Sequence, residues 1–280
     1  MSDFFDQLEK GTIAPTEAFK KNLDAALEQN PKLLEQVFFD KNGRQMTLMN
    51  RVIELSDDTA DFIPAIDYVR SKLPNINHGE PVHWAIKLGK ITIAKHLLQP
   101  QEANKLVFDL DRRSPEGLSL LFLVIQAKLQ DLLALLIGQN INIHTSSFSA
   151  ALEHDVQPLH QCIAANFGEG VRLLGKANAQ LDNPVGPLKQ TPLIQAAQGL
   201  KLDALEALLE FPVDQLKLEE KNLNYYPSLS VGHTAVEELC EYLLAGKHTK
   251  DAVKGIAMLL CRGADLLRND DMRLALSWHK

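Results

Sequence analysis

The octapeptide QTPLIQAA, residues 190–197, joins a threonine-proline step to an apolar run in a way that suits the first turn of a helix. The Thr191 hydroxyl can accept a hydrogen bond from a backbone amide of that turn. Pro192 is tolerated next to it because the first amide of a helix has no partner within the helix. Weaker copies of the octapeptide occur elsewhere, so the chain uses this kind of helix start repeatedly.

The copies are spaced regularly enough to define a repeat. PVHWA at 81–85 and PLHQC at 158–162 keep the proline and the apolar residue after it, whereas SLLF at 119–122, GHTAV at 232–236 and TLM at 47–49 keep less. The central apolar residues of the six copies are Leu48, Val82, Leu121, Leu159, Leu193 and Val236. Their spacings of 34, 39, 38, 34 and 43 residues indicate a repeat protein in which most copies carry insertions. We expect all six residues to be buried.

A second apolar stretch with helical spacing follows the openings and closes with a pair of leucines, as in 91–98 and 202–209. The chain must turn after this pair, and Asn140, Asn178 and Gly263 stand at that position in three copies. A helix often ends in the left-handed backbone conformation, which glycine adopts without a Cβ penalty and asparagine tolerates better than most residues. We therefore expect left-handed backbones at all three positions.

These residues together resemble the ankyrin-repeat family. The resemblance implies an all-α ankyrin-repeat solenoid with a helical N-terminal cap and long inter-repeat loops, in which no unit buries its apolar face without its neighbours. It also implies that His83 and His160 link the start of a helix to an adjacent loop by hydrogen bonds. Residues 1–40 show helix punctuation without the repeat and are expected to form the cap. Residues 41–280 are expected to hold about six repeats, the last one partial or capping.

Composition and charge exclude several classes of function. The net charge of −7 argues against nonspecific nucleic-acid binding, which calls for a basic stripe. The three cysteines, Cys162, Cys240 and Cys261, include no close pair, so neither a disulfide framework nor a zinc site is indicated. No apolar run is long enough to span a bilayer, and the first residues do not form a signal peptide. A cytoplasmic location is expected, and a signal-independent route of secretion into a host cell is compatible with it.

The sequence indicates no enzyme, cofactor or metal. His160 and Cys162 stand two residues apart, which invites a Cys/His nucleophile, but residues two apart on a helix point in different directions. Cys162 also occupies a position where the repeat places a buried alanine, and a small inert thiol suits that position. The nine histidines form no HxxxH or HExxH arrangement that would bind a metal on a helix.

The partner site is expected on the first helices of two successive units, because the ankyrin arrangement exposes these helices on its concave side. The outward positions there are apolar and include Trp84, Leu88, Leu120 and Leu123. The alternative is that loops or the cap cover this strip. Insertions at 99–116, 143–156 and 215–231 are expected to form loops, often on the binding face. Two loop tyrosines, Tyr225 and Tyr226, are a second candidate contact, with packing on a neighbouring repeat as the alternative.

The function expected from these observations is a protein-protein interaction scaffold that binds an unidentified partner protein and acts as a monomer. The degenerate repeats, irregular insertions and acidic charge are similar to ankyrin effectors that intracellular bacteria deliver into host cells. Two alternatives stay open, namely a targeting module of a longer enzyme and a regulator of an endogenous enzyme. Neither nucleic-acid binding nor membrane insertion is expected.

Overall fold

The computed structural model describes residues 17–39, 43, 45–99, 108–114, 117–149, 152–221 and 232–265. Apart from the helix at residues 17–29, their α-helices form six pairs of successive helices, as the ankyrin-repeat class predicts. The chain divides into two compact units, residues 1–116 and residues 117–280. The segment 271–280, expected to be a capping or partial repeat, lies outside the described residues.

The first unit contains two of the helix pairs. Its elements are α2 (Glu17–Gln29), β1 (Phe38–Phe39), β2 (Gln45–Met46), α3 (Leu48–Leu55), η1 (Ala60–Phe62), α4 (Ile63–Lys72), α5 (Pro81–Lys87) and α6 (Ile91–Leu98). α3 packs against both α4 and α5, and α5 packs against α6. α2 lies against α4 and buries Phe19 and Leu23, which is the contact expected of a cap. The boundary of this cap near residue 40 stays a prediction.

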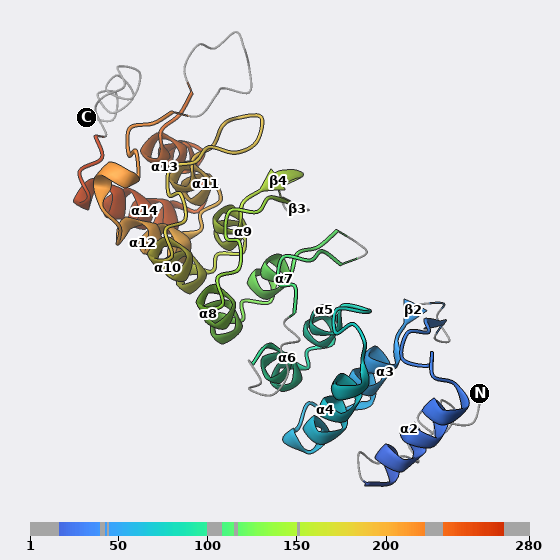
Figure 1. Cartoon of the computed structure of the whole chain (residues 1–280). Helices are drawn as coiled ribbons and strands as arrows, with labels where there is room; N and C mark the ends of the chain where they lie inside the picture. Colours follow the sequence, from blue (N-terminus) through green and yellow to red (C-terminus); the bar gives the residue numbers. More distant parts are fainter. Residues whose placement is uncertain are drawn as a thin grey trace, which may run out of the picture. The chain divides into compact units, whose positions relative to one another are not determined.

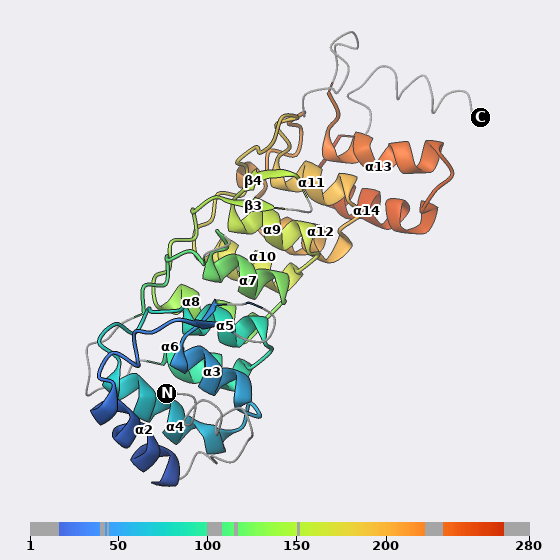
Figure 2. The same cartoon turned by 90° about the vertical axis from the view of Figure 1, so that its right-hand side faces the viewer.

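The second unit contains the other four pairs. Its elements are α7 (Leu120–Gln126), α8 (Gln130–Gly138), β3 (Ser147–Ser149), β4 (His154–Val156), α9 (Pro158–Ala164), α10 (Gly168–Lys176), α11 (Pro192–Gln198), α12 (Leu202–Leu209), η2 (Val213–Gln215), α13 (Ala235–Leu244) and α14 (Thr249–Cys261). The first helices α7, α9, α11 and α13 pack side by side in one row, and the second helices α8, α10, α12 and α14 form another (Figure 1). The same two rows are visible from the side in Figure 2.

The helix starts follow from the threonine and serine positions. Thr191 accepts a hydrogen bond from the amide of Ile194, and Thr47 accepts one from the amide of Asn50. Thr234 forms a complete capping box, because the Glu237 carboxylate also accepts from the Thr234 amide at 2.7 Å. Each cap satisfies amides that would otherwise lack a partner at the start of a helix.

The helix ends confirm the expected left-handed residues. Asn140, Asn178 and Gly263 have φ angles of 59°, 66° and 93°. In each case the amide of the following residue donates back to the carbonyl five residues earlier, as Ala179 does to Leu174 at 3.0 Å. This bond satisfies a carbonyl of the last helical turn, which is why the position requires a residue that tolerates positive φ.

The six central apolar residues of the repeat are all buried, with between 0% and 2% of each side chain exposed. The register read from the octapeptide is therefore confirmed. The all-α expectation omitted one feature, since two small antiparallel hairpins interrupt the helices. β1 pairs with β2 through Phe38 and Met46, and β3 pairs with β4 through Phe148 and Asp155.

Candidate partner-binding site

A groove of about 440 Å³ opens in the first unit between the starts of α3 and α5. The β1–β2 hairpin also lines it through Gln45 and Met46, and the segment 108–114 lines it through Arg112 and Ser114. The lining side chains that define its character are Val37, Met46, Asn50, His78, Glu80, His83, Trp84, Lys87 and Arg112. Trp84 is half-buried and is one of the residues that line the groove.

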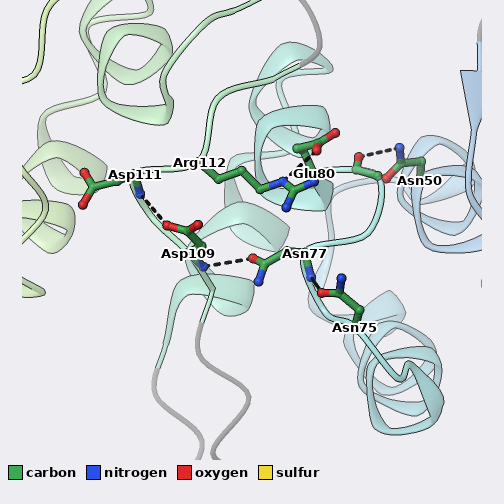
Figure 3. A network of polar contacts seen from close by, with 8 residues as sticks. Asn50, Asn75, Asn77, Glu80, Asp109, Asp111 and Arg112 are labelled. Atoms are coloured by element: carbon green, nitrogen blue, oxygen red, sulfur yellow. Dashed lines mark hydrogen bonds and ion pairs between the residues drawn. The ribbon is translucent and has the colours of Figure 1, made fainter.

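A tight loop before α5 places its first turn close to α3. Gly79 has a φ of +76°, and a Cβ built there would lie 2.5 Å from Cγ2 of Thr47, so only glycine fits. The Gly79 carbonyl accepts a hydrogen bond of 2.8 Å from Nδ2 of Asn50. Glu80 follows with a φ of 45° and precedes the proline that begins α5. The start of the Trp84 helix is thus tied to the neighbouring repeat by the close approach of Gly79 to Thr47 and by the hydrogen bond from the Asn50 side chain (Figure 3).

The segment 108–114 is attached to the same loop by two contacts. The amide of Asp109 donates to Oδ1 of Asn77 at 2.9 Å, and Arg112 donates through Nε to Oε1 of Glu80 at 2.9 Å (Figure 3). At the beginning of the segment, the Arg70 guanidinium lies 5.3 Å from the centre of the Phe108 ring. Burial lowers the pKa of Arg70, and nearby Asp67 partly opposes the effect. These contacts hold one wall of the groove in place.

The groove combines an apolar surface with both signs of charge. Trp84 and Met46 supply apolar area, whereas Glu80, Lys87 and Arg112 supply charge around it. The Glu80 side chain is 13% exposed and that of Arg112 is 46% exposed. An ion pair with one partner so open to water contributes little to stability, on the order of 0–1 kcal/mol. An incoming acidic or basic group can therefore replace one partner of this ion pair at small free-energy cost.

The residues that the sequence predicted for partner binding differ in their exposure in the structure. Trp84 on α5 and Leu88 directly after it are both half-buried, and Trp84 lines the groove. Leu120 and Leu123 are 2% and 8% exposed, so the expectation that they face outward is corrected. The reason is that α7, with sequence LLFLVIQ, is apolar all round, and such a helix is buried on every side. Tyr225 and Tyr226 lie outside the described residues.

His160 and Cys162 are both buried inside the repeat array. Nε2 of His160 lies 2.9 Å from the carbonyl oxygen of Asn183, which is the helix-to-loop link that the family resemblance implied. Burial lowers the pKa of His160 to about 4, and neighbouring His154 adds to the effect. Cys162 is fully buried, and burial raises the pKa of its thiol far above the ordinary value. The contact of His160 with the loop and the burial of the Cys162 thiol fit structural roles for both side chains.

Sequence reasoning missed most of the groove. Met46 belongs to the β1–β2 hairpin, which the repeat pattern did not predict, and Val37 directly precedes this hairpin. Glu80 precedes the matched PVHWA segment. Arg112 falls within the insertion 99–116, which the irregular repeat spacing had marked as a loop of interest. The signal in the sequence that pointed to this groove was therefore the insertion 99–116 in the repeat whose first helix carries Trp84.

Repeated helix pairs, capped first helices and left-handed helix ends define an ankyrin-repeat protein, and this class of protein is a protein-interaction scaffold. The chain belongs to the ankyrin-repeat family. It is 39% identical to the Legionella pneumophila effector AnkC, over 97% of this chain and 86% of that one, with a TM-score of 0.85. No family model matches the sequence, and no curated protein matches it.

Two more distant structures share the fold. The ankyrin repeat domain of Bcl-3, a member of the IκB protein family, is 18% identical with a TM-score of 0.60, covering 85% of this chain and 97% of that one. The human ASB11 ankyrin repeat domain is 14% identical with a TM-score of 0.56, covering 95% and 99%. Among the helices of the described ranges, none has both the length and the apolar character needed to cross a membrane.

Proposed function

We propose that this protein binds a host protein through the groove around Trp84 and acts as an effector delivered into a host cell. The observation that carries the binding site is the half-buried Trp84 in a groove of about 440 Å³. Aromatic anchors that fill or line a pocket dominate the energy of many protein interfaces. Leu88, four residues after Trp84 and directly after α5, is also half-buried.

The binding function involves no chemistry by the array itself. The described residues contain no cluster of three His, Cys, Asp or Glu side chains that could hold a metal ion. The buried state of His160 and Cys162 supports a packing role for both. The proposal of an effector rests on the similarity to AnkC along nearly the whole chain. The host protein that fits the groove would present an apolar side chain to Trp84 and a charged group to Lys87 or Arg112.

The test of the groove is capture of a partner from host-cell lysate by wild-type protein, Trp84→Ala and Lys87→Glu. Loss of an aromatic anchor that contributes about 2 kcal/mol weakens capture by more than tenfold. Phe148→Ala is the matched control, because Phe148 is an exposed aromatic residue, 59% accessible, on the β3–β4 hairpin. Thermal unfolding of each variant shows whether the fold is intact. Equal capture by wild type and both groove variants contradicts the proposed site.

Lys87→Glu separates a binding defect from a folding defect. Lys87 is exposed at the end of α5, so reversing its charge changes the rim of the groove and leaves the core packing unchanged. If Trp84→Ala unfolds but Lys87→Glu folds and still captures the partner normally, Trp84 is a core residue and the site lies elsewhere. Delivery is tested with a reporter-enzyme fusion in Legionella with and without its effector secretion system. Equal reporter signal in host cells from both strains contradicts the effector role.

A further inference from the structure

The first unit exposes two large apolar side chains among the residues that the structure describes, and both stand at the β1–β2 hairpin. Val37, directly before β1, is 45% exposed, and Phe39 within β1 is 68% exposed. Val37 is also one of the residues that line the Trp84 groove. A single exposed apolar residue needs no explanation, but apolar surface that adjoins a groove is typical of a protein-interaction site. The hairpin therefore carries apolar surface next to the groove.

The pairing of the hairpin determines which face of it carries Phe39. β1 and β2 run antiparallel, with Phe39 opposite Gln45. Directly opposed residues project from the same face of a sheet, with their Cβ atoms about 4.5–5.5 Å apart. Gln45 is exposed and lines the groove, whereas Met46, which projects from the other face, is 3% exposed. Phe39 therefore lies on the outer face of the hairpin, beside a residue of the groove.

Phe39, Val37 and Trp84 form a surface that we call the apolar strip. Val37 and Trp84 line one groove, and Phe39 continues this surface along the hairpin beside Gln45. The strip joins two segments of the chain, since Trp84 belongs to α5 and the other two residues precede α3. Aromatic side chains supply a large contact area and lose little conformational entropy on binding, which suits Phe39 and Trp84 as anchors. A partner segment that fills the groove and also covers Phe39 would bury the whole strip.

The accessible charges beside the strip select the sign of the partner's charge. Lys87 is exposed and Arg112 is 46% exposed, whereas Glu80 is only 13% exposed. Glu80 accepts a hydrogen bond from Nε of Arg112 at 2.9 Å, and a guanidinium carries five N–H donors in all. A carboxylate of the partner can therefore bind Arg112 beside Glu80, and Lys87 attracts the same charge. The rim of the groove is basic, although the whole chain carries a net charge of −7.

We propose that the apolar strip binds a short apolar segment of the host protein that carries a carboxylate. Phe39 and Trp84 anchor the apolar side chains of this segment, and Arg112 and Lys87 bind its acidic residue. The inference rests on the proposed function, because it extends the Trp84 groove, and it adds a second anchor and the sign of the partner's charge. The basic rim repels a basic segment, and the net charge of −7 disfavours a nucleic acid.

The test uses the whole protein and three fluorescent dodecapeptides, which repeat the units Leu-Phe-Glu-Gly, Leu-Phe-Lys-Gly and Ser-Asn-Glu-Gly. Fluorescence anisotropy should show that the Leu-Phe-Glu-Gly peptide binds wild type and that the other two bind about tenfold more weakly. The Leu-Phe-Lys-Gly peptide carries the wrong charge, and the Ser-Asn-Glu-Gly peptide lacks the apolar side chains. Failure of wild type to bind the Leu-Phe-Glu-Gly peptide overturns the inference. Equal binding of either of the other peptides overturns it as well.

Phe39→Ala tests the second anchor. Because Phe39 is 68% exposed, the variant should fold normally and bind the Leu-Phe-Glu-Gly peptide about tenfold more weakly. Phe148→Ala is the matched control, because Phe148 is 59% exposed in the other short hairpin, and it should bind nearly as wild type. Equal binding by wild type and Phe39→Ala overturns the inference. Equal losses in Phe39→Ala and Phe148→Ala also overturn it, because the peptide then has no preferred site.

Lys87→Glu tests the charge and should weaken binding of the Leu-Phe-Glu-Gly peptide several-fold. Lys254→Glu is its control, because it reverses an exposed charge on α14 in the other unit, and equal losses in the two variants overturn the inference. Trp84→Ala distinguishes this inference from the groove itself. If Trp84→Ala loses the peptide and Phe39→Ala does not, the groove stands and the second anchor is refuted. The peptides contain no host protein, so a failure to capture one from lysate leaves these results unchanged.

Discussion

The side-chain oxygen Oδ1 of Asn166 accepts a hydrogen bond from the backbone amide of Ala204 at 3.2 Å. Asn166 stands with a φ of 48° in the turn between α9 and α10, whereas Ala204 lies in the first turn of α12 in the next repeat. Nδ2 of Asn166 also donates a hydrogen bond to the Asp203 carboxylate at 3.2 Å. Asp58 has the same relationship with Ile93 in the first unit, at 3.1 Å. A left-handed turn residue of one repeat thus caps the second helix of the following repeat.

This relationship predicts different outcomes for two asparagine-to-glycine changes. Asn166→Gly keeps the positive φ but removes the cap on α12, so it should lower the free energy of unfolding by about 1 kcal/mol. Asn178→Gly is the control, because Asn178 has the same backbone conformation but its side chain caps no helix among the residues that the structure describes. That change should be neutral or mildly stabilising. Chemical denaturation of both variants measures the difference, and equal effects would refute the capping role.

The close approach of Gly79 to Thr47 predicts a strong response to a single methyl group. Gly79→Ala adds a Cβ within 2.5 Å of Thr47 and also places alanine at a φ of +76°. Gly89→Ala has the same backbone penalty, with a φ of +72°, but nothing within 4 Å of the new atom. The control should lose about 1 kcal/mol of stability and Gly79→Ala about 1–3 kcal/mol more. Urea titrations measure the loss in the free energy of unfolding for each variant. Similar losses would show that the loop moves to accommodate the methyl group without strain.

The buried repeat position predicts a large loss on truncation. Leu121 is 1% exposed in the first turn of α7, so Leu121→Ala should lower the free energy of unfolding by about 2–5 kcal/mol. Leu244 is 57% exposed at the end of α13, and Leu244→Ala should change it by less than about 0.5 kcal/mol. Denaturant midpoints measure both. A near-zero change for Leu121→Ala is incompatible with its burial.

His160 predicts loss of stability in mild acid. Burial lowers its folded-state pKa from 6.5 to about 4, so above pH 6.5 the imidazole is neutral in both folded and unfolded states. Between pH 6.5 and 4 the unfolded chain takes up a proton that the folded protein refuses, and stability falls as pH falls. His160→Gln should lose this part of the pH dependence. Unfolding free energies at pH 7 and 4.5 test it, and an unchanged slope in the variant would exclude His160 as the source.

The cysteines predict unequal thiol reactivity. Cys261 is exposed, whereas Cys162 and Cys240 are buried, and burial with help from Glu237 and Glu241 raises the pKa of Cys240 to about 11. At pH 8 a thiol-specific colorimetric reagent should therefore modify one cysteine of the native protein rapidly. All three should react after denaturation. Cys261→Ser removes the fast phase, and fast labelling of that variant would show that a buried thiol is accessible.

The sequence by itself determined the repeat, its register and its helix ends. The spacing of the central apolar residues predicted their burial, because a first helix must present its apolar face to its neighbours in the stack. Asn140 and Asn178 predicted left-handed backbones for a local reason, since few side chains tolerate that conformation. Thr234 and Glu237 likewise stand three residues apart, which is enough to specify a capping box.

Only the tertiary structure decided which of the apolar first-helix residues are accessible. Trp84 and Leu123 occupy the same position of the repeat, but Trp84 is half-buried in a groove and Leu123 is buried. The difference depends on the side chains that each helix meets, and a repeat period does not encode those. Arg112 and Glu80 are 32 residues apart and meet because an insertion returns to the loop before α5. Local propensity fixes where a helix starts and ends, whereas a binding surface is defined by contacts between segments that are distant in the chain.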